Sequence, residues 1–318
     1  MRIDVLALHD VFDLGLSALL DAFQTANELI GAAGLTVPPF DVRVVGVRRS
    51  VRTAQGFTVP VRPPSRQVPD CVVVPAIGFK MPGPLEHALG RPDVAQAGAL
   101  LRRYADRGAM VTAACIGTFV LAESGLLDDH QATTTWWLAP LFRKRYPRVN
   151  LEESSMVVKS GRLVTAGAAL GHLDLALWIV RSRSPQLSAL TAKYLIVDAR
   201  PSQSAYALAD HLVHDDPVVQ RFERWARGRL ARGFSLEDAA KATGASKRTL
   251  ARHMQRVLGK SPLAYFQRLR VERAVHLLKT GDASVDEIAT KVGYADGATL
   301  RTLLRRKLNL GVKEIRSR

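Results

Sequence analysis

The C-terminal third of this chain of 318 residues contains an internal repeat with a period of 49 residues. The repeat superimposes serines, small alanines and glycines, namely Ser235 on Ser284, Ala240 on Ala289 and Gly244 on Gly293. Serine caps helix N-termini, glycine adopts the left-handed conformation of a tight turn, and alanine lets a second helix cross closely. Each copy therefore predicts a helix-turn-helix motif. We expect helices at 218–231, 236–243, 247–258, 262–279, 285–292 and 297–307.

Positive charge is concentrated in the same third of the chain. Residues 219–318 contain 23 Lys and Arg against 9 Asp and Glu, which gives +14 of the total net charge of +16. Clustered positive charge is typical of a domain that binds a polyanion, most often nucleic acid. We therefore expect double-stranded DNA as a partner. The alternative is an arginine-rich protein whose basic faces are only solvated.

Three stretches of this region match a known pattern. They are Ser235-Leu-Glu-Asp-Ala-Ala with Ser246-Lys-Arg-Thr-Leu-Ala-Arg, then Arg268-Leu-Arg-Val-Glu-Arg-Ala, and finally Ser284-Val-Asp-Glu-Ile-Ala-Thr-Lys-Val-Gly-Tyr. Over about 85 residues this resembles an AraC/XylS-type DNA-binding domain, with a connecting helix between two helix-turn-helix motifs. The chain departs from the pattern at Leu308-Asn309 and Val312, where the family usually has Phe-Gly and Pro.

The second helix of each motif carries the candidate DNA-binding side chains. These are Lys247, Arg248 and Arg252 in the first motif, and Thr299, Arg301 and Arg305 in the second. Arginine can pair with both acceptors of a guanine edge in the major groove, whereas lysines such as Lys260 and Lys307 suit phosphate. A phosphate contact or an ion pair within the domain is the alternative for any single arginine.

The first two-thirds of the chain alternates strand-like and helix-like patterns. Apolar runs at 3–8, 40–47, 71–74, 110–114 and 163–166 predict strands, and amphipathic stretches at 14–29, 94–107, 118–123 and 173–180 predict helices. This alternation predicts a flavodoxin-like, doubly wound α/β domain with a mostly parallel sheet, followed by an all-α domain. We place the α/β domain at 1–185, a linker at 186–217 and the DNA-binding domain at 218–318.

Composition excludes several classes of protein. The longest apolar runs fall short of the roughly 18 residues that a membrane span needs, and the N-terminus lacks a signal-peptide core. Two cysteines, Cys71 and Cys115, cannot build a disulfide framework or a cysteine-based zinc site. We expect a cytoplasmic protein with no cofactor, no metal and no membrane partner.

Cys115 lies between a predicted strand and a predicted helix. The sequence Met110-Val-Thr-Ala-Ala-Cys115-Ile-Gly-Thr118 is typical of a nucleophile elbow, a sharp strand-to-helix turn that presents a reactive side chain. A thiol near a helix N-terminus is favoured as thiolate. The alternative is a small buried cysteine, which is common in protein cores.

Two longer stretches place this cysteine in a family. Ala113 to Leu127, followed by Ala132-Thr-Thr-Thr-Trp136, and Thr165-Ala-Gly-Ala-Ala-Leu-Gly-His-Leu-Asp174 resemble the class I glutamine amidotransferase-like, ThiJ/PfpI group of domains. Joined to an AraC-type domain, this arrangement resembles the GlxA-like subfamily of transcription regulators.

Departures from the group bear on catalysis. Thr135 stands where the resemblance implies a histidine that activates the cysteine, and a hydroxyl cannot act as general base near neutral pH. The resemblance also implies an acidic partner from the first loop: Asp13 is nearby, but the spacing to Asp21-Ala-Phe23 puts Gly15 at the equivalent position. Of the loop that would donate hydrogen bonds to an oxyanion in that group, Gly78 is the one glycine kept. We expect a small-molecule pocket that does not catalyse a reaction. Its candidate residues are Asp13, Gly78, Cys115, Ile116, Thr135 and His172.

The sequence thus favours a sequence-specific transcription regulator with a sensor domain that binds a small-molecule effector, and the resemblance implies a homodimer. An enzyme of the hydrolase or amidotransferase type that uses Cys115 is the alternative. A third hypothesis is an interaction module that only dimerises the protein or contacts RNA polymerase.

Overall fold

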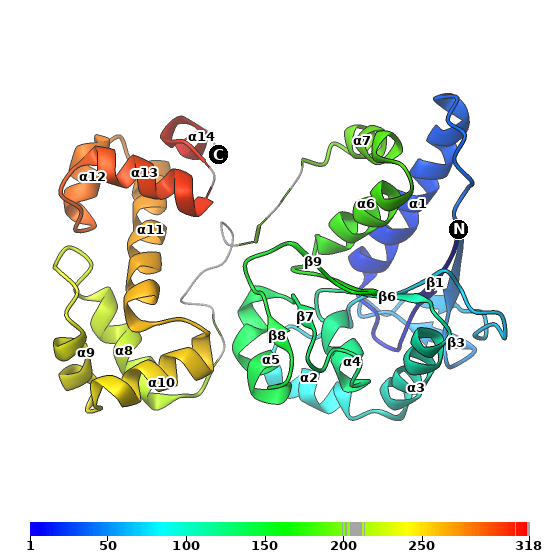
Figure 1. The fold of residues 1–318 in the computed structure, drawn as a ribbon, viewed down its shortest axis with the longest axis horizontal. Helices are drawn as coiled ribbons and strands as arrows, with labels where there is room; N and C mark the ends of the chain where they lie inside the picture. Colours follow the sequence, from blue (N-terminus) through cyan, green and yellow to red (C-terminus); the bar gives the residue numbers. More distant parts are fainter. Residues whose placement is uncertain (199, 201, 204–211, 213, 309, 317–318) are drawn as a thin grey trace. The chain divides into compact units, whose positions relative to one another are not determined.

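A computed structural model describes residues 1–198, 200, 202–203, 212, 214–308 and 310–316 (Figure 1). The chain divides into two compact units, Met1–Gln203 and Ser204–Arg318. Among the described residues, every helix falls short of the length and apolarity that crossing a membrane would require.

The first unit is built on a sheet of six strands. Their order is β2 (Asp41–Val45), β1 (Arg2–Leu6), β5 (Cys71–Val74), β6 (Met110–Ala114), β10 (Leu163–Ala166) and β9 (Val157–Ser160). All neighbours pair in parallel except β9, which runs antiparallel to β10 at the edge. The five parallel strands, taken in chain order, are arranged 2-1-3-4-5, which is the flavodoxin-like order. The predicted fold class is confirmed.

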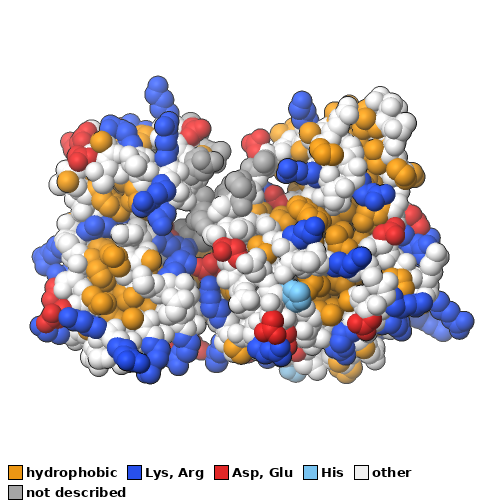
Figure 2. All heavy atoms as spheres, in the orientation of Figure 1, with side chains coloured by type: hydrophobic (Ala, Val, Ile, Leu, Met, Phe, Trp, Pro, Cys, Tyr) orange, Lys and Arg blue, Asp and Glu red, His pale blue; other side chains and the backbone are white. Residues whose placement is uncertain are grey.

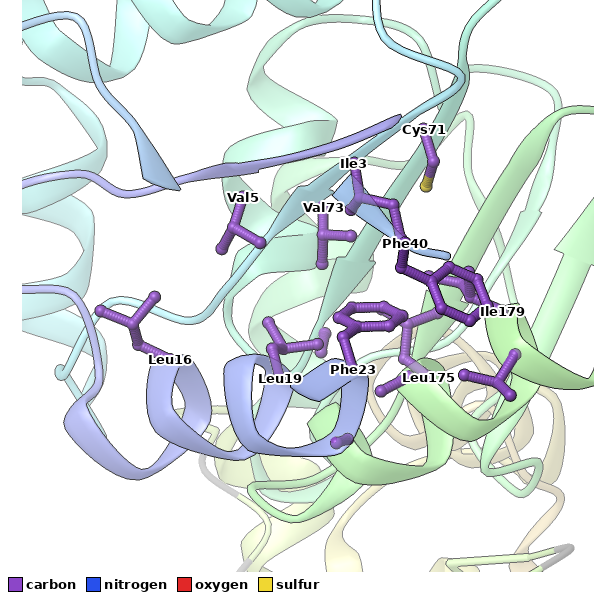
Figure 3. Packing of buried hydrophobic residues seen from close by; sticks show 14 of the residues in the cluster. Ile3, Val5, Leu16, Leu19, Phe23, Phe40, Cys71, Val73, Leu175 and Ile179 are labelled. Atoms are coloured by element: carbon purple, nitrogen blue, oxygen red, sulfur yellow. The ribbon is translucent and has the colours of Figure 1, made fainter. Parts of the chain in front are cut away.

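Helices cover both faces of this sheet. On one face lie α1 (Asp13–Ala32), α6 (Gly171–Arg183) and α7 (Pro185–Tyr194), and on the other lie α2 (Pro82–Leu89), α3 (Pro92–Asp106) and α4 (Gly117–Glu123). Figure 3 shows Leu19 and Phe23 of α1 packed with Leu175 and Ile179 of α6 and with Val73 of β5. The helical spacing of the apolar residues in α1 therefore produces the buried face that it predicts.

Smaller elements surround this core. They are the hairpin of β3 (Ser50–Arg52) and β4 (Thr58–Pro60), the short pair of β7 (Gln131–Ala132) and β8 (Asn150–Leu151), the 3-10 turn η1 (Trp136–Leu138), and α5 (Ala139–Arg145). The first unit extends past the predicted boundary at residue 185. Leu187 of α7 is fully buried in the core, and the Ser184 hydroxyl caps that helix by accepting from the Leu187 amide.

The described part of the second unit is helical. Its elements are α8 (Pro217–Arg227), α9 (Leu236–Thr243), α10 (Lys247–Leu258), α11 (Pro262–Thr280), α12 (Val285–Lys291), α13 (Gly297–Leu308) and α14 (Val312–Arg316). Gly244 and Gly293 have φ values of 64° and 81°, the left-handed conformation that the repeat predicts. The hydroxyls of Ser235 and Ser284 cap their helices, so both predicted helix-turn-helix motifs are present.

The C-terminal departures from the AraC pattern do not prevent a final helix. The sequence did not predict α14, whose Ile315 is buried in the core of the second motif. Asn309 lies outside the described residues.

Candidate functional site

The candidate pocket residues lie at the carboxyl edge of the parallel sheet. Asp13, Gly78, Cys115 and His172 follow β1, β5, β6 and β10, which are adjacent strands. The order reverses between β1 and β5, and ligands of such sheets bind at this switch point. Here the loop after β1 and the loop after β5 are joined by a hydrogen bond, in which the Gly78 amide donates to the Asp10 carbonyl at 2.7 Å. That amide, which the sequence offered as an oxyanion donor, is therefore occupied.

Cys115 occupies the strained turn that the sequence predicts. Its φ is 56°, which is uncommon for a residue other than glycine, and its amide donates to the Ala166 carbonyl at 2.7 Å. The Thr134 hydroxyl donates to the Cys115 carbonyl at 2.8 Å. At Gly117 a Cβ atom would lie 2.3 Å from the Val74 carbonyl oxygen, so only glycine lets α4 begin this close to β5.

The structure favours the alternative of a small buried cysteine over a thiolate at Cys115. The residue is 3% exposed, and burial raises the pKa of its thiol to about 12. The Ile116 amide, the Thr135 hydroxyl and the Lys80 charge lower the pKa by less than burial raises it. Desolvation therefore exceeds the effect of the seven-residue helix α4, and the thiol is neutral near pH 7.

His172 is held by backbone groups on both sides of its ring. Its Nδ1 donates to the Ala169 carbonyl at 2.6 Å, and its Nε2 accepts from the Ala76 amide at 3.1 Å. Burial lowers the pKa of the imidazole to about 4. A Cβ at Gly15 would lie 2.6 Å from Nε2, so the ring fills the space that a side chain from α1 would need. His172 is therefore neutral and has both nitrogens engaged, so it is not placed to activate Cys115.

Two buried threonine hydroxyls lie at the cysteine turn. Thr118 and Thr135 are fully buried, and within the described part of the chain neither hydroxyl oxygen makes a hydrogen bond of normal geometry. The Thr135 hydroxyl nevertheless lies near enough to lower the pKa of Cys115. Asp13 is half-buried, and its Oδ2 accepts from the Gln55 amide at 3.1 Å. Ile116 is buried directly after the cysteine.

Gln203 is a site residue that the sequence did not reveal. Its fully buried side chain donates from Nε2 to the Thr134 carbonyl at 2.9 Å and to the Thr133 hydroxyl at 3.1 Å. A Cβ at Gly167 would lie 2.4 Å from Nε2. Gln203 lies inside the predicted linker, so this part of the linker is anchored on the strand end that faces Cys115. A polar residue in an irregular stretch carries no local signal for such a contact.

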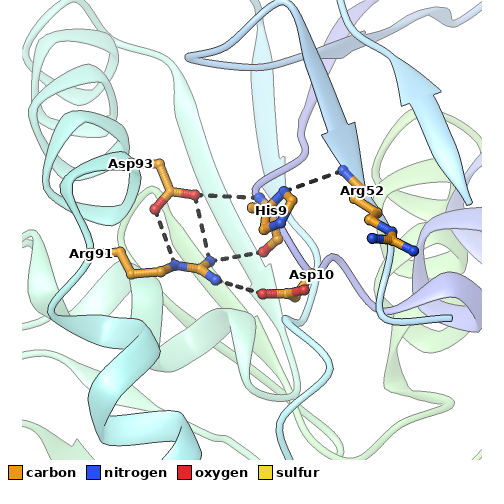
Figure 4. A network of polar contacts seen from close by, with 5 residues as sticks. All are labelled: His9, Asp10, Arg52, Arg91 and Asp93. Atoms are coloured by element: carbon orange, nitrogen blue, oxygen red, sulfur yellow. Dashed lines mark hydrogen bonds and ion pairs between the residues drawn. The ribbon is translucent and has the colours of Figure 1, made fainter. Parts of the chain in front are cut away.

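An ion-pair network holds the loop after β1 (Figure 4). Arg91 pairs with Asp10 at 2.6 Å and with Asp93 at 3.2 Å, and it also donates to the His9 carbonyl at 2.8 Å. The φ of Asp10 is 60°, so the network fixes an uncommon backbone conformation. Among the described residues, no cluster of three or more His, Cys, Asp or Glu side chains is placed to hold a metal ion.

The candidate DNA-binding residues lie on the exposed faces of α10 and α13. The exposed residues are Lys247, Arg248, Arg252, Thr299, Arg301, Arg305 and Lys307, whereas Lys260 is half-buried. Opposite them on α10, Leu250, Met254 and Leu258 are buried in the core. Figure 2 shows Lys and Arg side chains spread over the visible face of the helical unit.

Lys247 takes part in an ion pair within the domain. Lys247 lies 3.3 Å from Glu237. Within the described ranges, Arg248, Arg252, Arg301 and Arg305 form no ion pair, so their guanidinium groups are available to another molecule.

Comparisons with known proteins agree with this architecture. The model of the DJ-1/PfpI family matches residues 1–182, more than half of the chain. The chain belongs to the DJ-1/PfpI family. In this family member, residues 239–318 match a helix-turn-helix domain model, which is of the AraC type. Both resemblances inferred from the sequence are confirmed.

Curated relatives of this DJ-1/PfpI family member are named as regulators. It is 26% identical over 230 residues to the HTH-type transcriptional regulator GbdR of Pseudomonas aeruginosa, covering 71% of this chain and 60% of GbdR. It is 34% identical over 127 residues to the HTH-type transcriptional activator RhaS of an Enterobacter species, covering 40% of this chain and 44% of RhaS. The chain thus matches less than two thirds of the length of either relative.

Solved structures resemble the first unit in fold. An AraC family transcriptional regulator from Pseudomonas putida has a TM-score of 0.51 at 20% identity, covering 61% of this chain and 98% of that structure. A ThiJ/PfpI family protein from Pseudomonas syringae has a TM-score of 0.50 at 18% identity, covering 63% of this chain and 76% of that structure.

Proposed function

We propose that this chain is a sequence-specific DNA-binding transcription regulator whose α/β unit binds a small molecule without catalysing a reaction. The observation that carries the proposal is the pair of helix-turn-helix motifs with exposed arginines on both second helices. The naming of GbdR and RhaS as transcription regulators supports it.

The positions of Arg252, Arg301 and Lys307 support a role in DNA binding for each. Arg252 and Arg301 are equivalent in the 49-residue repeat, and a guanidinium in the major groove can pair with O6 and N7 of guanine. Lys307, at the exposed end of α13, is assigned to phosphate. Two recognition helices of one unit would read two blocks of sequence about one helical turn, roughly 10 bp, apart.

Selection of duplexes from a random-sequence pool, followed by footprinting, tests the DNA assignment. We expect Arg252→Ala and Arg301→Ala each to cost about 1–3 kcal/mol and to relax preference in different blocks. Lys307→Ala should weaken all sequences alike and reduce the salt slope by about one unit. Equal losses of affinity for selected and random DNA would indicate that both arginines contact phosphate instead of bases. Failure of the chain to select any sequence would contradict the regulator function.

The non-catalytic assignment depends on the state of Cys115. A neutral buried thiol is a poor nucleophile, Thr135 cannot activate it, and His172 has both nitrogens engaged. We expect the wild type to show no Cys115-dependent turnover of amide, ester or dicarbonyl substrates, that is, no activity that is lost in Cys115→Ser. Such turnover above about 1 s⁻¹, an ordinary enzymatic rate, would favour the enzyme instead.

Within the described residues, the buried hydroxyls of Thr118 and Thr135 make no hydrogen bond of normal geometry, and this supports the small-molecule assignment because a bound polar group would satisfy them. A panel of small amides, amines and carboxylic acids can be screened by thermal shift. A compound that raises the Tm of the wild type should raise that of Thr135→Val less. An equal shift in both proteins would place the ligand elsewhere.

We also propose that the protein is a homodimer through its α/β unit, because two linked DNA-binding units gain effective concentration on neighbouring sites. Light scattering of the full chain at micromolar concentration should give twice the monomer mass of 34.8 kDa. A monomer under these conditions would contradict this assignment.

A further inference from the structure

The helical unit has two separate hydrophobic cores that share the helix α11. Tyr265, Phe266 and Leu269 pack in the core of the first helix-turn-helix motif. Val271 and the residues after it on α11 pack in the core of the second. Arg270 stands at the junction and is only 9% exposed. The relative orientation of the two motifs therefore depends on α11 and on contacts near this residue.

The Arg270 guanidinium donates hydrogen bonds to the segment between α8 and α9, which packs against the core of the first motif. Its Nε donates to the Leu230 carbonyl at 2.9 Å, and its Nη2 donates to the Arg232 carbonyl at 2.5 Å. Within the described part of the chain, Arg270 forms no ion pair with a carboxylate. Backbone carbonyls therefore accept the hydrogen bonds of this buried guanidinium. Burial lowers the pKa of Arg270.

The same guanidinium contacts the turn of the second motif. Its central carbon lies 5.2 Å from the ring centre of Tyr294 and 4.8 Å from that of Phe266, both within cation–π range. At Gly293 a Cβ would lie 2.3 Å from Nη2 and 2.5 Å from the Leu230 carbonyl oxygen. The α8–α9 segment and the turn of the second motif thus approach each other closely, with Arg270 between them.

We propose that Arg270 is a positioning residue that sets the separation and angle of α10 and α13, and thereby the spacing between the two DNA blocks. This inference rests on the proposed function. The 19-residue helix α11 is about 28 Å long, so a tilt of about 10° moves its far end by about 5 Å. That displacement exceeds the rise of one base pair, about 3.4 Å. The contacts of Arg270 at the junction therefore determine the spacing of DNA blocks that α10 and α13 can bind at the same time.

The test compares Arg270→Lys with Arg273→Lys, a matched control on the exposed face of the same helix. The probes are a two-block duplex that the wild type selects from a random-sequence pool, its one-base-pair insertion and deletion, and a single-block duplex. Lysine keeps the charge but cannot bond two carbonyls in a fork while stacking between two rings. We expect Arg270→Lys to bind the single block within about twofold of wild type. The same variant should bind the two-block duplex about tenfold more weakly, because simultaneous engagement is impaired. It should also discriminate less among spacings, and Arg273→Lys should behave as wild type.

Two results would overturn the inference. One is an unchanged spacing preference in Arg270→Lys, and the other is an equal loss on single-block and two-block duplexes, which would indicate a purely structural role. If Arg270→Lys does not fold by circular dichroism, Tyr294→Leu decides, because it removes one ring contact and leaves both carbonyl bonds. It should broaden the spacing preference in the same direction, and an unchanged preference overturns the inference. A wild-type chain that selects no sequence at all would instead remove the proposed function.

Discussion

Replacing His172 with glutamine is expected to reduce the acid sensitivity of the α/β unit. The imidazole is buried with a pKa of about 4, whereas its ordinary value of 6.5 applies in the unfolded chain. The unfolded state therefore binds more protons below pH 6.5, so the contribution to stability is complete above that pH and is lost as the pH falls towards 4. At pH 5 the loss attributable to His172 is about 2 kcal/mol.

Urea unfolding followed by tryptophan fluorescence at pH 7.5 and pH 5.0 measures this effect. His172→Gln will be less stable than wild type at pH 7.5, because it disturbs the bonds to Ala76 and Ala169. The informative quantity is the change in the free energy of unfolding between the two pH values, compared between wild type and variant, because the contributions of other titrating groups cancel in that comparison. That change should be smaller in His172→Gln by about 2 kcal/mol, whereas the exposed His87→Gln should match wild type. A difference below about 0.5 kcal/mol between wild type and His172→Gln would refute the assignment of a neutral, buried imidazole.

Three further predictions concern the thiols, one glycine and one cap. Burial raises the pKa of both Cys71 and Cys115 to about 12, so the native protein should resist a thiol-specific disulfide reagent at pH 8 and react only in denaturant; rapid native labelling would contradict this. Gly117→Ala should lower the free energy of unfolding by about 1–3 kcal/mol, because the added Cβ would meet the Val74 carbonyl oxygen. Gly83→Ala, whose Cβ would meet open space, should be nearly neutral. Equal effects of the two substitutions would contradict the close approach of α4 to β5. Ser284→Ala should cost about 1 kcal/mol in thermal unfolding because it removes the serine half of a capping box, and an unchanged Tm would argue against that cap.

Features that depend on neighbouring residues were determined by the sequence alone. Ser284 and Gly293 fix where a helix begins and where a turn becomes left-handed, because capping and positive φ involve only a few residues. The alternation of strands and helices predicted a mostly parallel sheet covered by helices on both faces in the same way. The exposed positions of Arg252 and Arg301 also followed from helical periodicity.

Tertiary structure decided the properties of the same residues that depend on distant groups. The pKa of Cys115 follows from its burial, which the motif does not encode, so the sequence could not decide between a thiolate and a buried neutral thiol. His172 bonds to an amide 96 positions earlier, and Gln203 bonds to Thr133, 70 positions earlier. Arg270 joins two turns 40 and 23 residues away on either side of it. Desolvation and long-range hydrogen bonds arise only when the folded chain brings such groups together, whereas caps and periodicity act within a few residues of backbone.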